Sequence, residues 1–257
     1  MILRRLSTNL RAQNWTAIAI EVLIVIVGVF IGTQVSNWNQ DRLEKRATTQ
    51  MLDQLLPEVR GQLDFFSGIK DYFGTTARYA NQALAGWKGD PRISDEQFVI
   101  AAYQATQIYG IGINAQVWAL KFGGEQLREI DDPSLRRDLA VVLTADYTPV
   151  EYTTVATPYR EDVRQLIPND IQDRIRAQCG DRTIYPKHGQ SLVVLPRTCS
   201  LKLDPAKTAS AAAALRANPK LANELNWHLA AVATYLQNAD GLEHQMRTLE
   251  RDLERRS

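Results

Sequence analysis

The sequence is poor in the residues that usually carry chemistry. It contains three histidines and two cysteines in 257 residues. His188, His228 and His244 have no spacing at which two of them would bind one metal ion. The sequence has no nucleophile turn of the form G-x-S-x-G, no phosphate-binding loop and no H-E-x-x-H motif. We therefore expect no catalytic site, no cofactor and no metal.

Neighbouring acids do not supply a catalytic pair either. Asp131 and Asp132 are adjacent, and so are Glu161 and Asp162. Adjacent side chains on a helix point about 100° apart, so the carboxyls of each pair do not share a proton. His228 lies in an apolar helical pattern, which is more typical of a packed core histidine than of a catalytic base.

An excess of one charge is also lacking. The 30 basic and 29 acidic residues leave a formal net charge of +1, and the two signs are interspersed. Proteins that bind nucleic acid carry basic patches or stripes. We therefore expect no nucleic-acid partner.

The longest apolar stretch lies near the N-terminus. From Thr16 to Thr33 every residue is apolar or small apart from Glu21, and about 20 such residues form one membrane-spanning helix. Trp15 and Trp38 bracket the stretch about 35 Å apart along a helix, as interfacial aromatic anchors do. A cleaved signal peptide is the alternative, but no A-x-A-like cleavage site follows.

One face of this helix is predicted to contact another membrane helix. Glu21, Gly28 and Gly32 fall within about 20° of one line at 100° per residue. The two glycines form a G-x-x-x-G step, where helix backbones approach closely. An acid inside a membrane usually faces a protein partner or a wet cavity. The alternative is that Glu21 is hydrated near the headgroups and the glycines are incidental.

Basic residues predict the orientation. The first 14 residues hold three arginines and no acid, whereas the two signs nearly cancel just after the span. By the positive-inside rule, residues 1–14 are a basic cytoplasmic tail, 15–38 the transmembrane helix and 39–257 an exported periplasmic domain.

The run IEVLIVIVGVFIGTQVSNWNQDR resembles the N-terminus of a widespread uncharacterised family of bacterial single-pass inner-membrane proteins. That family shares a membrane-embedded acid, a G-V-F step, a Gln and a closing N-W-N. Their counterparts here are Glu21, Gly28-Val29-Phe30, Gln34 and Asn37-Trp38-Asn39. The resemblance is limited to about residues 15–42. It implies an inner-membrane location and no known activity.

Helical periodicity dominates the rest of the chain. From Asp41 to Trp87 apolar residues recur every three or four positions, which predicts a long helix continuing the span. We expect Pro57 to bend or break it and Gly89-Asp90-Pro91 to end it. This stripe would fit a coiled-coil seam, but its aromatic side chains are wide for one, so an intramolecular bundle is favoured. A second stripe, Leu221 to Leu253, predicts an antiparallel partner helix.

Capping signals predict shorter helices between these two. Ser94 and Gln97 form a capping box for a helix through about Tyr109. The pattern G-x-G-x-x-A follows at 110–115, but no strand precedes it, so a helix–helix turn is favoured over a nucleotide site. A helix from Asn114 to about Lys121 comes next. Further helix starts are predicted at Asp132-Pro133, running toward Asp146, and at Asp204-Pro205 and Asn218-Pro219.

Two segments are harder to assign. The threonine-rich stretch 144–159, interrupted by prolines, is either one kinked helix, which we favour, or two helices with an extended link. Asn169 starts a further helix, which Gly180 can close in a left-handed conformation.

The segment 180–203 breaks the helical pattern. Two prolines and a β-branched run predict a loop or small hairpin over the bundle. Cys179 and Cys199 lie at its ends, and in an oxidising periplasm they form a disulfide that closes about 20 residues and adds about 3 kcal/mol of stability. Two free buried thiols in a cytoplasmic protein are the alternative. Zinc is disfavoured because His188 lacks companion ligands.

These patterns predict an all-α fold: a single N-terminal transmembrane helix followed by a helical bundle with a small loop or hairpin excursion. Aromatic residues crowd the segment from Phe65 to Trp118. Core packing accounts for most of them, and a ligand pocket between helices is the alternative.

The expected function is a membrane-anchored periplasmic scaffold or accessory subunit of an inner-membrane complex, without catalysis. Its partners would be the lipid bilayer and another membrane helix, from a second copy or from another protein. The alternative is a periplasmic ligand-sensing domain, which would need a membrane partner because only 14 residues precede Trp15. An enzyme ranks third.

Overall fold

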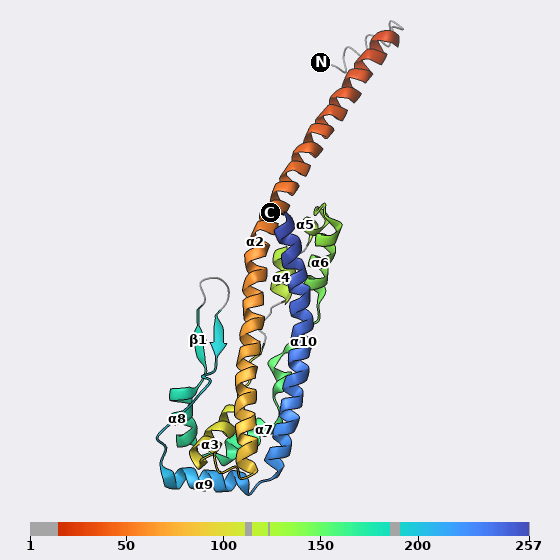
Figure 1. Ribbon diagram of the computed structural model, residues 1–257. Coiled ribbons are helices and arrows are strands. Elements are labelled where there is room, and N and C mark those ends of the chain that lie inside the picture. The colour runs from red at the N-terminus through yellow and green to blue at the C-terminus, as the bar shows by residue number, and fades with distance from the viewer. Residues whose placement is uncertain (1–14, 111–114, 123, 186–190, 257) are drawn as a thin grey trace. The chain divides into compact units, whose positions relative to one another are not determined.

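The computed structural model describes residues 15–110, 115–122, 124–185 and 191–256 (Figure 1). The chain divides into two compact units, Met1–Met51 and Leu52–Ser257. Helix α2, Trp15–Trp87, begins in the first unit and ends in the second. The fold is all-α, as predicted, and the strands in the described ranges are those of one small hairpin.

Helix α2 is unbroken over 73 residues, so Pro57 does not break it. The alternative expectation, that Pro57 bends the helix, stays a prediction. A proline removes one backbone hydrogen bond, here to the carbonyl of Asp53. Pro57 and Asp53 are both exposed, so water can satisfy that carbonyl. Leu55 and Val59 on either side are fully buried and hold the helix on the core.

The end of α2 follows the sequence prediction. Gly89 has a φ of 74°, in the left-handed region that favours glycine. Its N–H donates to the Gly86 carbonyl at 3.2 Å, and the Asp90 N–H donates to the Ala85 carbonyl at 3.0 Å. This pair of bonds is a Schellman motif, which satisfies carbonyls that the last helical turn leaves without partners.

Helix α10, Lys220–Arg256, is the predicted antiparallel partner of the part of α2 after Leu52. Arg60 pairs with Glu254 at 2.6 Å, and Lys70 pairs with Asp240 at 2.5 Å. The two helices therefore run antiparallel. The core between and around these helices includes Tyr72, Tyr103, Tyr159, Tyr235, Phe66, Phe73, Phe98, Phe122, Leu55, Ile69, Ile100 and Leu135, all fully buried.

Shorter helices pack on this pair. Helices α6 and α7 lie along α10, and α9 lies against α3 (Figure 1). Their bounds are α3 Asp95–Gln104, α4 Ala115–Phe122, α5 Glu125–Arg128, α6 Pro133–Thr144, α7 Pro158–Leu166, α8 Asn169–Cys179 and α9 Pro205–Arg216, with 3-10 helices η1 Thr148–Val150 and η2 Tyr152–Val155.

Three of the predicted helix starts are confirmed by their caps. Ser94 and Gln97 form the capping box of α3. Asp132 accepts a hydrogen bond from the Ser134 N–H at 2.8 Å, and Asp204 accepts one from the Lys207 N–H at 2.9 Å. These side chains satisfy N–H groups that a helix leaves free in its first turn.

Two expectations about these helices are corrected. Helix α3 ends at Gln104, before the expected Tyr109. The stretch 144–159 is not one kinked helix. It forms η1 and η2 and then the start of α7, because the chain is extended at Glu151, ψ 150°, and at Thr157, ψ 159°. A proline disfavours helical backbone angles at the residue before it, and Thr157 precedes Pro158.

Gly180 closes α8 without the left-handed conformation expected of it. Its φ is −73° and its ψ 178°, which is extended. A Cβ there would lie 2.4 Å from the carbonyl oxygen of Arg176. The glycine is therefore required by close approach to the preceding turn. The G-x-G-x-x-A pattern falls largely on residues 111–114, outside the described residues.

The segment 180–203 contains the predicted hairpin. Strand β1, Arg182–Ile184, pairs antiparallel with β2, Leu192–Val194, and Thr183 lies opposite Val193. Leu192 packs on α2, where a Cβ added to Gly68 would lie 3.3 Å from its Cδ2 atom. The hairpin therefore lies on the helical core, as expected.

Candidate functional site

The apolar first part of α2 can cross a membrane by its length and composition. None of the residues in its most apolar part is buried, and Leu23, Ile26 and Phe30 are all exposed. Trp15 and Trp38, which bracket the stretch, are 69% and 64% exposed. A contiguous apolar surface of this size marks a site for lipid or protein contact. A signal sequence near an N-terminus would meet the same length and composition criterion.

Glu21, Gly28 and Gly32 lie on one unbroken helix, so the helical period places them on one face. A Cβ added to either glycine would meet nothing within 4 Å. Neither glycine is therefore required by packing within the described chain. Glu21 is half-buried, and its Oε2 atom has no hydrogen-bond partner among the described residues.

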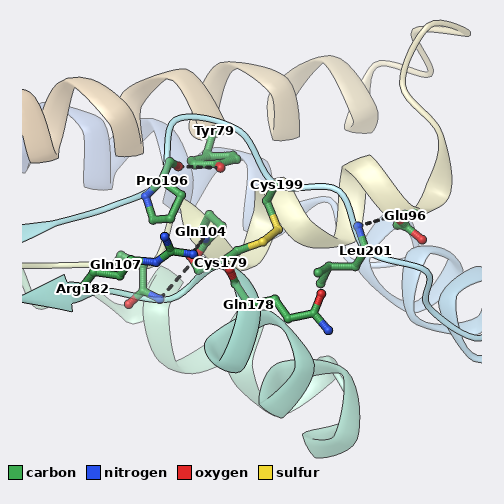
Figure 2. Close-up of a disulfide and its surroundings, with 10 residues drawn as sticks. All are labelled: Tyr79, Glu96, Gln104, Gln107, Gln178, Cys179, Arg182, Pro196, Cys199 and Leu201. Carbon is green, nitrogen blue, oxygen red and sulfur yellow. Dashed lines mark hydrogen bonds between the residues drawn. A yellow bond between two sulfur atoms is a disulfide. The ribbon is translucent and has the colours of Figure 1, made fainter.

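The predicted disulfide joins Cys179 and Cys199, whose Cα atoms are 5.7 Å apart. This distance lies within the range typical of disulfides. Figure 2 shows that the bond links the end of α8 to the chain returning from the hairpin. No cysteine is free among the described residues.

Hydrogen bonds from α2 and α3 hold the same region independently of the disulfide. Gln104 donates to the Cys179 carbonyl at 2.6 Å, and the Tyr79 hydroxyl donates to the Pro196 carbonyl at 2.8 Å (Figure 2). Glu96 accepts from the N–H of Leu201 at 3.0 Å. Side-chain hydrogen bonds to its backbone, as well as the covalent bond, therefore fix the base of the hairpin to the bundle.

His228 is buried in the core of the bundle, 1% exposed. Its Nδ1 atom lies 2.9 Å from the hydroxyl of Thr157, and its ring stacks on that of Tyr159. Burial, and then the charge of Arg160, lower the pKa of His228 to about 4, although the Ala105 backbone opposes the shift. The ring is neutral at pH 7, which suits a core histidine.

Sequence reasoning missed a pair of arginines on α7. Arg160 and Arg164 are four residues apart and share a face of the helix. Arg160 donates to the Thr106 carbonyl at 2.5 Å. Arg164 donates to the Thr106 hydroxyl at 3.0 Å and to Gln107 Oε1 at 3.1 Å. These acceptors are all uncharged, and neither arginine forms an ion pair with a carboxylate of the described residues.

Both arginines are half-buried. The guanidinium of Arg164 lies 4.8 Å from the ring centroid of Tyr103. Burial, followed by the neighbouring charge of Arg160, lowers the pKa of Arg164. Like charges four residues apart on a helix destabilise it unless something offsets them, and this is the signal in the sequence that would have revealed the pair.

One carboxylate lies near the two arginines. Asp181 accepts a hydrogen bond from the Tyr72 hydroxyl at 3.0 Å. Burial raises the pKa of Asp181, while the Tyr72 hydrogen bond and the charges of Arg160 and Arg164 partly offset that effect. The carboxyl of Asp181, which accepts the Tyr72 hydrogen bond, thus lies near two guanidinium groups.

An open cleft of about 590 Å³ lies beside this cluster. Its walls come from the loop after α3, from the start of η2 and from the first turn of α7. The lining residues are Ile108, Tyr109, Gly110, Glu151, Tyr152, Ala156, Thr157, Arg160 and Glu161. In the parts of the chain that the structure describes, no group of three or more His, Cys, Asp or Glu side chains is placed to hold a metal ion.

No protein-family model, curated protein or solved structure matches this chain. Any conclusion about function therefore depends on the residues and their geometry.

Proposed function

We propose that the protein is a membrane-anchored helical scaffold or accessory subunit of a bacterial inner-membrane complex. Glu21, Gly28 and Gly32 contact a membrane helix of another protein or of a second copy. The observation that carries this proposal is the open face of α2, where both glycines have free space for a close neighbour. We propose no catalytic step.

The positions along the span suit such a contact. At 1.5 Å per residue, Glu21 lies about 9 Å beyond Trp15 and Gly28 lies about 20 Å beyond it. Both positions fall within the roughly 30 Å hydrocarbon core. Close packing and interhelical hydrogen bonds, rather than the hydrophobic effect, drive helix association in lipid. The glycines would supply the close packing and Glu21 the hydrogen bond.

The proposed orientation places residues 39–257 in the periplasm. The arginines of the tail favour a cytoplasmic N-terminus. The bond between Cys179 and Cys199 supports export, because disulfides persist in oxidising compartments. An export-dependent reporter fused after Ser257 should be active, and activity only from a cytoplasm-dependent reporter would reject the orientation.

The contact face is tested by crosslinking full-length protein in native membranes and identifying the crosslinked partners. Gly28→Leu and Gly32→Leu should weaken association because the added side chain separates the backbones. Glu21→Ala should remove a hydrogen bond worth about 1 kcal/mol, which is about fivefold in association.

The matched control is Ala19→Leu, which also replaces a small residue by leucine. Ala19 lies about 180° from Gly28 around the helix, and Ile26 lies about 160° from it, so Ile26→Leu serves as a second control. Equal crosslinking yields for the Glu21, glycine and control variants would show that α2 is an anchor without a contact face.

A further inference from the structure

The cleft beside α7 has the dimensions of a small-molecule site. Its volume of about 590 Å³ lies within the roughly 300–1,000 Å³ typical of ligand pockets. One wall is fixed firmly, because the ring of Tyr109 lies 5.7 Å from that of Phe65 and 5.6 Å from that of Tyr72. Gly110 lies directly against η2, since a Cβ there would lie 2.6 Å from the Cβ atom of Tyr152.

Arg160 gives the cleft a cation with unused donors. A guanidinium has five N–H donors, and the structure gives Arg160 one hydrogen bond, to the Thr106 carbonyl. Arg164 adds a second positive charge nearby, and the carboxyl of Asp181 accepts from Tyr72. An arginine that forms no ion pair at a half-buried position can bind an anion, and its planar fork matches a carboxylate.

Two carboxylates line the same cleft. Glu151 and Glu161 are exposed, and neither forms an ion pair with another side chain of the described residues. They provide acceptors for a ligand ammonium group. Glu161 follows Arg160 in the first turn of α7, so a cation and an anion project into one cleft from adjacent positions.

The surface between these charges is apolar. Tyr109, Tyr152 and Ile108 are among the residues that line the cleft. Tyr152 is 59% exposed, which leaves its ring free to cover a ligand. Most ligand sites have this composition, in which apolar walls supply contact area and a few polar groups fix orientation.

We propose that this cleft binds a small zwitterion, an α-amino acid with an apolar or aromatic side chain. Its carboxylate pairs with Arg160 and its ammonium group with Glu161. Its side chain lies between Tyr109 and Tyr152. This site is separate from the membrane face of α2, so either proposal can fail without the other.

The experiment uses the full-length protein in lipid nanodiscs and titration calorimetry. The probes are L-phenylalanine and L-leucine, with benzoate and 2-phenylethylamine as analogues that each lack one charged group. Both amino acids should bind, and each analogue should bind at least about tenfold more weakly than L-phenylalanine, because one charge-assisted contact is lost.

Variants assign the contacts. Arg160→Gln should weaken L-phenylalanine binding about tenfold or more. Glu161→Gln should weaken binding of L-phenylalanine and 2-phenylethylamine but not of benzoate. The control is Arg174→Gln, since Arg174 is an exposed arginine that also donates to a backbone carbonyl, that of Lys202, at 2.8 Å. It should bind like the unchanged protein.

If Arg160→Gln does not fold, the Tyr152→Ala and Glu161→Gln variants test the site in its place. Both side chains are exposed, and neither forms a hydrogen bond with the described core. The proposal is overturned if millimolar amino acids give no binding heat. It is also overturned if benzoate binds as tightly as L-phenylalanine, or if the Glu161 and Tyr152 variants bind like the Arg174 control.

Discussion

Two glycines in long helices should respond in opposite ways to the same substitution. Gly86 lies in the last turn of α2, and a Cβ there would lie 2.2 Å from Cδ2 of Phe98 and 2.8 Å from its Cγ atom. Gly241 lies in the middle of α10, and a Cβ there would meet nothing within 4 Å. Replacing glycine by alanine inside a helix stabilises it by about 1 kcal/mol where space allows.

At Gly86 the steric cost exceeds that gain. The Phe98 ring must move by more than about 1 Å to reach an ordinary contact distance. Phe98 is fully buried, its ring lies 5.0 Å from that of Trp87, and the guanidinium of Arg216 lies 4.9 Å from its centroid. Overpacking of this kind costs about 1–3 kcal/mol, toward the upper end when the neighbour is held on several sides.

We therefore expect Gly86→Ala to lower the free energy of unfolding by about 2 kcal/mol and Gly241→Ala to raise it by up to about 1 kcal/mol. For a unit of this size the first change lowers Tm by about 4–8 °C. Urea unfolding of the full-length protein in detergent, followed by circular dichroism, measures both. A Gly86→Ala protein as stable as Gly241→Ala would refute the packing described for Phe98.

Two further perturbations test the disulfide and the buried histidine. Replacing Cys179 and Cys199 together by alanine should lower the free energy of unfolding by about 3 kcal/mol, because the unfolded chain is no longer closed into a loop of 20 residues. Urea unfolding of the variant and of the oxidised unchanged protein measures the difference, and equal stability of the two would contradict the prediction. Burial holds the pKa of His228 near 4 in the folded state, below its value of about 6.5 in the unfolded chain. As the pH falls, the unfolded chain therefore takes up the proton first. The free energy of unfolding then falls by about 2 kcal/mol from pH 7 to pH 5. His228→Gln should flatten that dependence of the urea midpoint, and an unchanged slope would show that other groups cause it.

Features encoded by neighbouring residues were predictable from the sequence. The capping box at Ser94, the N-caps at Asp132 and Asp204 and the helix end at Gly89 each depend on a few adjacent side chains. The two apolar stripes likewise predicted the long helices, and the positions of the cysteines predicted the disulfide. In each case local chemistry and the final packing favour the same structure.

The errors arose where distant residues decide the local conformation. Pro57 is tolerated because it lies on the exposed face of a helix that the core holds on both sides. Gly180 is required by the position of the Arg176 carbonyl, which its own φ does not reveal. The local sequence gives the angles that a residue prefers, whereas packing determines which of them it adopts.

The cleft beside α7 could not be predicted for the same reason. Arg160 meets Thr106 across 54 positions of sequence, and Tyr72 meets Asp181 across 109. Nothing in the spacing of these residues indicates a shared site. Only the spacing of Arg160 and Arg164 was informative. Two like charges four residues apart indicate that other residues must offset their repulsion.

The covalent bond between Cys179 and Cys199 also has a consequence for proteolysis of the protein. It turns the hairpin segment into a closed ring. A protease that cuts once inside that ring leaves both halves of the polypeptide joined through sulfur. Gln104 and Tyr79 still hold the ring's base on the bundle. A nicked molecule would therefore keep its mass and its helical core until a reductant separates the two fragments.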